Sequence, residues 1–197
     1  MITILDYGAG NLRSVENTLE ELGCAFRLVQ DARGLETAEK ILLPGVGHFG
    51  QMMRALDELD VRQALVERIR AGVPFLGICL GLQALFEASE EAPQARGLGI
   101  FPGTVRRFAA GVRIPHMGWN ELEVSRDSKL ACGLTVRPYV YFAHSYYVPV
   151  DPRAAATCTY GVPYTAVLEA GQVFGVQFHP EKSGAVGLHM VRNFVSC

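Results

Sequence analysis

The sequence predicts a single α/β domain over residues 1–197, with a mostly parallel central sheet flanked by helices and additional antiparallel strands in its second half. Short apolar segments alternate with helical segments up to about Ser89, which is typical of parallel strands joined by crossover helices. After Gly97 the helices give way to closely spaced β-rich segments. Neither a repeat nor a low-complexity linker divides the chain, and 197 residues are enough for one substantial core.

The first half begins with a short apolar strand and a glycine-containing turn. Asn11 is suited to cap the helix that follows, and Gly23 to end it, because glycine tolerates the left-handed conformation that often closes a helix. The predicted strands lie at 2–5, 24–30 and 40–43 and begin again at Val73, with helices at 12–22, 48–56 and 61–71 and a last helix that ends near Ser89.

The second half is rich in β-branched and aromatic residues. Ala170-Gly171 predicts a hairpin turn between its last two strands, and Ser183 is suited to cap a final helix that ends near Phe194. The predicted strands lie at 104–108, 119–124, 139–148, 154–160, 165–169 and 172–177.

Composition excludes several classes of function. A net charge of −2 gives no sign of a nucleic-acid partner. The five cysteines are widely spaced with no C-x-x-C pair, which argues against a disulfide framework or a zinc site and fits a reducing compartment. No basic region precedes the first strand, and no apolar segment approaches the roughly 18 residues of a membrane span. We therefore expect a cytoplasmic protein with no metal, no cofactor, and no nucleic-acid or membrane partner.

The stretch Gly77-Ile78-Cys79-Leu80-Gly81 has the strand, turn and helix pattern of a nucleophile elbow, with cysteine at the nucleophile position. Glycines beside the nucleophile allow the tight turn, because larger side chains would collide with neighbouring strands. A thiol at the start of a helix also lies at the positive end of the helix dipole, which favours the thiolate. A lone cysteine is more often a small buried apolar residue. The glycine frame favours a nucleophile, provided that a base and an acid lie nearby.

His179 is the histidine best placed to act as that base. An apolar segment delivers it to the carboxyl end of a strand, the edge where parallel sheets form their sites. Glu181 lies two residues later, and in an extended chain such side chains point the same way. Glu181 can then bond the imidazole nitrogen that faces away from the thiol and fix its tautomer. Cys79, His179 and Glu181 thus form a predicted triad for acyl transfer.

Acyl transfer also needs hydrogen-bond donors for the oxyanion. The backbone N–H of Leu80, just past the nucleophile, is one candidate. The loop Pro44-Gly45-Val46-Gly47 ends another strand and offers the N–H of Val46 as the second. Because glycines flank Val46, its peptide can hold two orientations at small cost, so this donor can be switchable. An ordinary strand-to-helix turn is the alternative interpretation of the loop.

Other interpretations of these motifs have weaker support. His179-Pro180-Glu181 alone also fits a surface turn, a metal pair or half of a zinc deaminase motif, but neither a third ligand cluster nor a P-C-x-x-C segment accompanies it. The Gly8-Ala9-Gly10 turn is similar to a dinucleotide-binding fingerprint, but Arg13 stands where the third glycine is required.

Together these motifs resemble the triad-type, class I glutamine amidotransferase family. Within it, the chain is similar over essentially its full length to the glutaminase subunits of imidazole glycerol phosphate synthases. The triad motifs specify only the wider family, whereas the blocks 6–11 and 116–120 narrow the resemblance to these subunits. The segments that carry the resemblance are 6–11, 44–47, 77–81, 116–120, 141–146 and 177–183.

The resemblance implies that Cys79 attacks the side-chain carboxamide of L-glutamine and forms a γ-glutamyl thioester, while His179 protonates the leaving ammonia and then activates water. Glu91 would pair with the substrate ammonium, and donors from Ser145 and Tyr146 would meet its carboxylate. From the residues alone, Glu91 is a solvated acid and Gln83 a polar residue at the core edge. The glutamine-binding positions of the family correspond here to Gly47, Gln83, Glu91, His144, Ser145 and Tyr146.

The resemblance also implies a separate (β/α)8-barrel cyclase subunit, which forms a heterodimer with the glutaminase and conducts ammonia to a phosphorylated ribulosyl-formimino aminoimidazole nucleotide. The cyclase products are imidazole glycerol phosphate and aminoimidazole carboxamide ribonucleotide, in histidine biosynthesis. We expect glutamine hydrolysis by the glutaminase subunit alone to be slow. Trp119 also fits a buried core aromatic, although tryptophan is favoured at interfaces. The family positions at the interface and ammonia gate correspond to Asn11, Trp119, Asn120, Tyr141 and Lys182.

Three alternative functions remain open from the sequence. A stand-alone thiol hydrolase, such as a γ-glutamyl peptidase, would need an open cleft and no obligate partner. The glutaminase subunit of pyridoxal phosphate synthase shares the triad but is expected to lack the block 116–120. A catalytically inactive scaffold subunit is disfavoured by the intact Cys79, His179 and Glu181.

Overall fold

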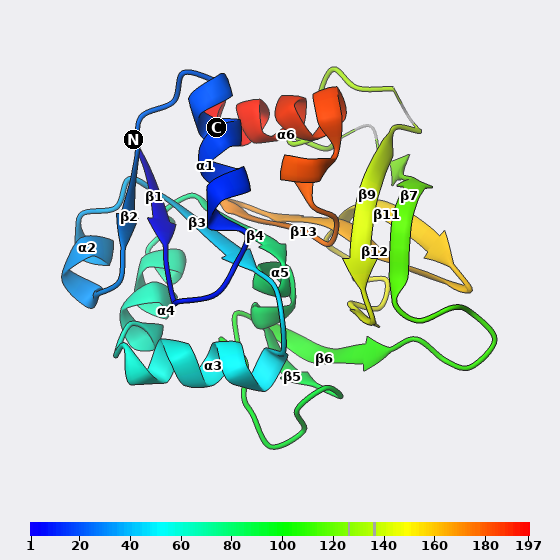
Figure 1. Ribbon diagram of the computed structural model, residues 1–197, viewed down its shortest axis with the longest axis horizontal. Coiled ribbons are helices and arrows are strands. Elements are labelled where there is room, and N and C mark those ends of the chain that lie inside the picture. The colour runs from blue at the N-terminus through cyan, green and yellow to red at the C-terminus, as the bar shows by residue number, and fades with distance from the viewer. Residues whose placement is uncertain (126, 136) are drawn as a thin grey trace.

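An eight-stranded sheet runs through the molecule (Figure 1). The computed structural model describes residues 1–125, 127–135 and 137–197. The first five strands in spatial order are parallel and the last three pair antiparallel, which confirms the predicted sheet. In spatial order the strands are β2 (Phe26–Val29), β1 (Ile2–Leu5), β3 (Lys40–Gly45), β4 (Phe75–Cys79), β13 (Val173–Val176), β12 (Val162–Ala170), β11 (Ala154–Tyr160) and β8 (Glu123–Val124).

Two smaller sheets extend the antiparallel half. One joins β10 (Tyr146–Tyr147), β6 (Phe101–Arg107) and β5 (Phe86–Ser89), and the other pairs β7 (His116–Glu121) with β9 (Tyr139–His144). Figure 1 shows β7 and β9 at the opposite end of the molecule from β2. The predicted strand at 139–148 is thus two strands, β9 and β10, which belong to different sheets.

Helices cover both faces of the large sheet (Figure 1). Side chains of β3 alternate between them: Leu42 packs in the core beneath α1 and α6, whereas Ile41 and Leu43 pack in the core beneath α3 and α4. Apolar residues on both faces explain why these strands have continuous hydrophobic sequences. The helices are α1 (Leu12–Glu21), α2 (Ala32–Glu36), α3 (Phe49–Glu58), α4 (Arg62–Arg70), α5 (Leu80–Ala84) and α6 (Gly184–Ser196), with a 3-10 turn at Pro180–Lys182.

The prediction of one long helix from Leu80 to about Ser89 is wrong. Helix α5 ends at Ala84, and the residues after it form β5. The returning chain prevents continuation, because Leu98 N–H donates to the Ala84 carbonyl oxygen and the Gly97 Cα packs against the Phe86 carbonyl, which leaves no room for a side chain at position 97. The helix propensity of the residues after Ala84 is therefore outweighed by the pairing of β5 with β6.

Helix α2 is an element that the sequence reading missed. Asp31 caps it, since its carboxylate accepts from the Gly34 N–H at 2.7 Å. Five residues give too little periodicity for a helix to be recognised from its apolar pattern. Within the described residues, no helix combines the length and apolar content that a membrane span requires.

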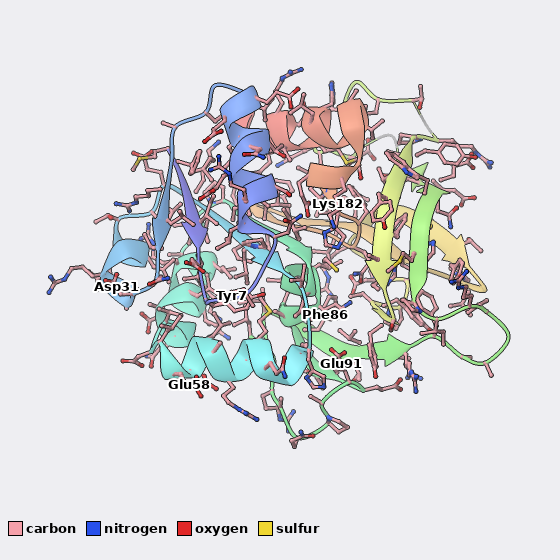
Figure 2. The ribbon with its side chains drawn as sticks, in the orientation of Figure 1. Tyr7, Asp31, Glu58, Phe86, Glu91 and Lys182 are labelled. Carbon is pink, nitrogen blue, oxygen red and sulfur yellow. The ribbon has the colours of Figure 1, made fainter. Side chains whose placement is uncertain are left out.

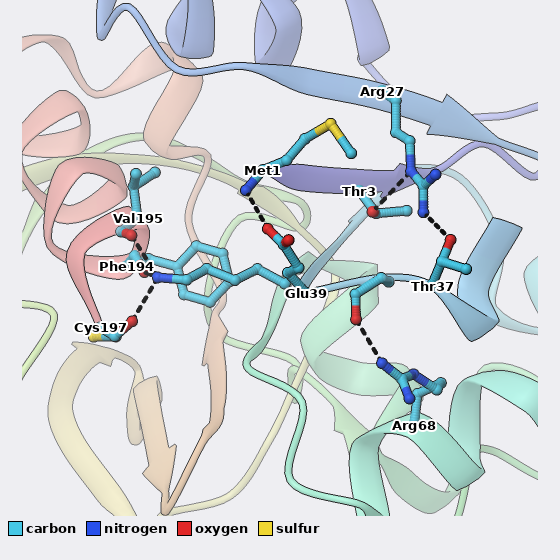
Figure 3. Close-up of polar contacts among 11 residues, drawn as sticks. Met1, Thr3, Arg27, Thr37, Glu39, Arg68, Phe194, Val195 and Cys197 are labelled. Atoms are coloured by element: carbon cyan, nitrogen blue, oxygen red, sulfur yellow. Dashed lines mark hydrogen bonds and ion pairs between the residues drawn. The ribbon is translucent and has the colours of Figure 1, made fainter.

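Polar contacts fasten the edge strands and the C-terminal helix to the sheet (Figure 3). The Lys40 ammonium, from the start of β3, donates to the carbonyl oxygens of Val195 and Cys197 at the end of α6. This places a cation at a helix C-terminus, where the helix dipole favours it. At one edge of the sheet, Arg27 of β2 donates to Thr37 Oγ1 at 2.6 Å and so ties β2 to the segment after α2.

Replacing Gly81 should destabilise the fold strongly. A Cβ at this position would overlap the Leu43 carbonyl oxygen, which is backbone and cannot move away cheaply. We expect Gly81→Ala to lower the free energy of unfolding by about 2–3 kcal/mol in urea denaturation. Gly171→Ala is the matched control, because its Cβ meets nothing within 4 Å and only the left-handed backbone, at φ +63°, is strained. Its cost should be about 1 kcal/mol, and equal losses in the two variants would contradict the steric argument.

Candidate active site

Cys79 lies at the turn between β4 and α5, in a backbone conformation that is rare for a residue with a side chain. Its φ is 54° and its ψ is −104°. Glycines make the turn possible: a Cβ at Gly77 would overlap the Gly81 carbonyl, and one at Gly45 would lie 2.6 Å from the Gly81 nitrogen. Strands β3 and β4 and helix α5 therefore meet backbone to backbone around the thiol. This is the geometry predicted for a nucleophile elbow.

His179 and Glu181 form a buried pair beside this elbow. His179 Nδ1 and Glu181 Oε1 are 2.8 Å apart, and the side chains are only 4% and 2% exposed. The contact does not arise from an extended chain, as the sequence reading assumed, because Pro180–Lys182 form a 3-10 turn that brings Glu181 back to the ring. Asn11, at the start of α1, adds a long contact of 3.5 Å from its Nδ2 to Glu181 Oε1. With Nδ1 engaged, His179 is left with Nε2 to act on the thiol.

The pKa of His179 is raised to about 10. Burial is the largest single influence and lowers this pKa, but hydrogen bonds and charge interactions with Cys79 and Glu181 together outweigh it. The ring is therefore protonated at neutral pH. An imidazolium between a carboxylate and a thiol is the arrangement that supports a thiolate nucleophile.

The backbone around His179 is tied to β9. The His179 N–H donates to the Tyr141 carbonyl oxygen at 2.9 Å. Ser183 completes the link, since its hydroxyl donates to the His179 carbonyl oxygen at 2.6 Å and accepts from the Tyr141 N–H at 2.9 Å. Ser183 stands at the N-cap position of α6 as predicted, but its side chain makes no bond to the helix. Asn11 likewise stands at the N-cap of α1 without capping it, since its side chain contacts Ser14 and Glu181.

A cavity of about 180 Å³ opens onto Cys79 and His179. The structure brings all of the predicted oxyanion and glutamine-binding positions to its wall. Three further residues, from β7, β9 and the segment before β7, complete it. The lining residues are Val46, Gly47, Cys79, Leu80, Gln83, Glu91, Pro115, Met117, Ala143, His144, Ser145, Tyr146 and His179.

Glu91, labelled in Figure 2, is held at the start of α3. Its Oε2 accepts from the Phe49 N–H at 2.7 Å, at the positive end of the helix dipole. One carboxylate oxygen is thereby anchored, and Glu91 lines the cavity instead of belonging to a wholly solvated acidic patch. The arrangement gives the cavity a carboxylate whose position is fixed.

His144 lines the cavity, and its side chain holds the neighbouring turn. Its ring is buried, and Nδ1 donates to the Tyr146 carbonyl oxygen at 2.8 Å. Burial lowers the pKa of His144 to about 3, so the ring is neutral and Nε2 is unprotonated. Because the one ring N–H is used inside the turn, Ser145 and Tyr146 are presented to the cavity in a fixed conformation.

Two residues near the thiol were missed by the sequence reading. Gln177, the last residue before Phe178 and His179, is completely buried and donates from Nε2 to Cys79 Sγ at 3.6 Å. Its signal was an amide between the apolar residues of β13 and Phe178. Tyr7, labelled in Figure 2, carries a buried hydroxyl with no hydrogen-bond partner among the described residues. Burial raises the pKa of Tyr7 to about 12, and the Val46 N–H lies close enough to oppose that rise.

The predicted interface residues lie mostly on one exposed face beside the triad. Trp119 and Tyr141 are directly paired across β7 and β9, with ring centroids 6.1 Å apart. The Lys182 ammonium lies 5.9 Å from the centre of the Tyr141 ring. Trp119 is 57% exposed, so the interpretation as a core aromatic is wrong. Asn120 points to the other face, where it donates to the Thr159 carbonyl oxygen at 3.2 Å.

Metal chemistry finds no support in this arrangement. Among residues 1–125, 127–135 and 137–197, no group of three or more histidine, cysteine, aspartate or glutamate side chains is placed to hold a metal ion. The zinc deaminase interpretation of His179-Pro180-Glu181 also conflicts with the geometry, because Glu181 is bonded to the imidazole itself.

Comparisons with known proteins agree with the geometry. The subunit HisH of imidazole glycerol phosphate synthase from Deinococcus radiodurans is 47% identical over 98% of this chain and 92% of its own. The subunit HisH from Methanothermobacter thermautotrophicus is 47% identical over 99% of this chain and 98% of its own. The chloroplastic imidazole glycerol phosphate synthase hisHF of Arabidopsis thaliana is 45% identical over 99% of this chain, which spans 34% of that protein.

Solved structures share the fold at lower identity. A crystal structure of a glutamine amidotransferase matches with a TM-score of 0.78 at 21% identity, covering 99% of this chain and 97% of that one. The structure of PurLQS from Thermotoga maritima matches with a TM-score of 0.75 at 22% identity, covering 99% and 97%. The family model described as "Glutamine amidotransferase class-I" matches residues 3–197. With its elbow cysteine, buried His–Glu pair and full-length relatives, this chain belongs to the class I glutamine amidotransferase family.

Proposed function

We propose that this chain is the glutaminase subunit of an imidazole glycerol phosphate synthase, which hydrolyses L-glutamine and passes the ammonia to a cyclase subunit. The observation that carries the proposal is the strained Cys79 facing the buried His179–Glu181 pair over a cavity of amino-acid size. The relatives with about 47% identity over nearly the whole chain are named as subunits of that synthase, which supports the assignment within the family.

Catalysis begins when the Cys79 thiolate attacks the carboxamide carbon of the glutamine side chain. The carbonyl π electrons move to oxygen and give a tetrahedral oxyanion. When this intermediate collapses, the C–N bond breaks and His179 gives its proton to the departing nitrogen. Ammonia leaves and a γ-glutamyl thioester remains on Cys79. The neutral His179 then takes a proton from water, the resulting hydroxide attacks the thioester, and glutamate leaves as the thiolate re-forms.

The cavity wall offers a complementary group for each end of the substrate. Glu91, anchored at the start of α3, pairs with the substrate ammonium. Ser145 and Tyr146, in the turn held by His144, donate to its carboxylate. Gln83 and Gly47 flank the position of the carboxamide. These assignments explain why the cavity wall combines one fixed carboxylate with a rigid turn of backbone donors.

The oxyanion is stabilised by the backbone N–H groups of Leu80 and Val46, which both border the cavity. Leu80 is fixed at the start of α5, whereas Val46 is 37% exposed and is followed by Gly47 at φ +97°. The buried Tyr7 hydroxyl is a nearby alternative partner for the Val46 N–H. Reorientation of the Val46 peptide when the partner binds would then complete the oxyanion hole and accelerate hydrolysis.

The partner is a (β/α)8-barrel cyclase that covers the face formed by Trp119, Tyr141 and Lys182. Trp119, Tyr141 and the exposed Met117 share one side of the paired strands β7 and β9. Exposed aromatic and methionine side chains of this kind are typical of protein interfaces. Asn11 contacts Glu181 of the triad, and Lys182 lies against Tyr141 on this face, so ammonia released at Cys79 would leave toward the partner.

Cys79→Ala should abolish glutamine-dependent synthesis by the complex while leaving ammonium-dependent synthesis intact. The substitution removes the nucleophile, but the cyclase can use ammonia from solution. Product formation from each nitrogen source, measured with the purified complex, provides the test. Loss of both activities would assign Cys79 a role in folding or assembly, and retention of glutamine-dependent synthesis would rule out the thioester mechanism.

Trp119→Ala should weaken activation by the partner. Titrating the wild-type subunit with cyclase and nucleotide should raise the rate of glutamine hydrolysis by about 10²-fold, because one oxyanion donor contributes about that factor to kcat. The half-activating cyclase concentration should rise by about 30-fold in Trp119→Ala, as for the loss of an interface hot spot. Leu28→Ala is the control, because Leu28 is an exposed apolar residue on β2, at the other end of the sheet. Full activity of the wild-type subunit without cyclase would refute the gating mechanism.

Histidine titration by NMR should separate His179 from the two buried neutral rings. His179 should stay protonated to beyond about pH 9, whereas His144 and His116, with pKa values lowered by burial to about 3 and about 4, should stay neutral down to about pH 5. Because the folded pKa of His179 lies above its ordinary value of 6.5, its protonation stabilises the fold fully below pH 6.5. That stabilisation is lost as the pH rises toward 10. Deprotonation of His179 near pH 6.5 would contradict the ion-pair mechanism.

A further inference from the structure

A continuous chain of hydrogen bonds joins the turn at 144–146 to the sulfur of Cys79. His144 Nδ1 and Gln83 Nε2 both donate to the Tyr146 carbonyl oxygen, each at 2.8 Å. Gln83 Nε2 also donates to Gln177 Oε1 at 3.1 Å, and Gln177 Nε2 donates to Cys79 Sγ at 3.6 Å. Gln83 and Gln177 are both buried, so water does not compete for these bonds.

The donors and acceptors in this chain fix the orientation of both amides. A backbone carbonyl oxygen can only accept, so the Gln83 NH₂ group must face Tyr146. The second hydrogen of the same NH₂ group then points to Gln177, which must present its oxygen. The Gln177 NH₂ group is thereby turned toward Cys79, as an N–H donor directed at the sulfur.

We propose that Gln177 is a further catalytic residue, which donates a hydrogen bond to the Cys79 thiolate and holds the sulfur in line for attack. The amide is set by Gln83, which lines the cavity, and by the turn at 144–146, so the same chain fixes the cavity wall and the nucleophile. This inference rests on the proposed function and adds a residue to its catalytic site.

The charged and titratable groups that face Cys79 do not replace this donor. Among the described residues, the cation that contacts Cys79 is His179, which follows the end of β13 and has Nε2 free to face the thiol. Burial keeps the phenols of Tyr7 and Tyr164 neutral, with the pKa of each raised. Across the cavity, His144 is neutral and Glu91 is anchored to α3. Gln177 is therefore an uncharged donor that can hydrogen-bond to the sulfur in addition to the ion pair with His179.

The test measures the rate of Cys79 alkylation by iodoacetamide as a function of pH, read on the Cys79 peptide by mass spectrometry. In Gln177→Met, which keeps the side-chain length but removes the donor, the midpoint of the pH profile should rise by about one unit because the thiolate has lost a hydrogen bond. The kcat for glutamine should fall by about tenfold while KM changes by less than about threefold.

Thr165→Val is the matched control. Thr165 is also completely buried, on β12, and its hydroxyl accepts from the Asp151 N–H and donates to the Pro149 carbonyl oxygen, away from the thiol. It should lower stability without moving the alkylation midpoint. A folded Gln177→Met protein with the wild-type midpoint would overturn the proposal. Because alkylation requires neither glutamine nor cyclase, the midpoint tests Gln177 separately from the proposed function, which fails instead if the wild-type complex with cyclase hydrolyses no glutamine.

A measurement on the wild-type protein keeps the proposal testable if Gln177→Met does not fold. The ¹⁵N chemical shift of the Gln177 side-chain amide should change with pH, with the same midpoint as Cys79 alkylation. It should change again when Cys79 is alkylated. An amide signal that responds to neither change would overturn the proposal.

Discussion

The close approach of three backbones around Cys79 is the constraint on which the rest of the site depends. β3, β4 and α5 meet where Gly45, Gly77 and Gly81 leave no space for a side chain. This contact holds Cys79 in a left-handed conformation that the residue would not adopt alone, and the strain is offset by the apolar cores on both faces of the sheet. The parallel half of the fold thus supplies a rigid nucleophile before any substrate is present.

The antiparallel half supplies the surroundings of that nucleophile. β13 belongs to the parallel block and ends next to the base, whereas β9 and β10, which belong to the two smaller sheets, bring the turn at 144–146 to the cavity. An aromatic cluster supports the turn: His144 packs 5.3 Å from the rings of Phe108 and Tyr164, and His116 stacks 3.9 Å from Tyr160. Burial in this cluster keeps both histidines neutral, so that the site contains a single protonated ring.

Much of this arrangement could be predicted because its causes are local. The elbow glycines, the strand before His179 and the strand–helix alternation all follow from short-range sterics and hydrophobic patterning. What could not be predicted depends on chain segments distant in sequence. The helix after Cys79 stops at Ala84 only because residue 97 returns beside it. Gln177 was visible as a polar residue directly after an apolar strand, but its partners Gln83 and Cys79 lie 94 and 98 positions away in the sequence.

The hydrogen bonds of Ser183 bear on which side chains of such a subunit can be substituted. Its hydroxyl and the His179 N–H join the base to the main chain of β9, while the side chains of β9 that face outward take no part in those bonds. The bonds that position the base therefore run through the backbone of β9 and leave the side chains of Tyr141 and Trp119 free to vary. Substitutions on the outer face can accumulate and adapt to a changing partner, while the position of the imidazole is inherited unaltered.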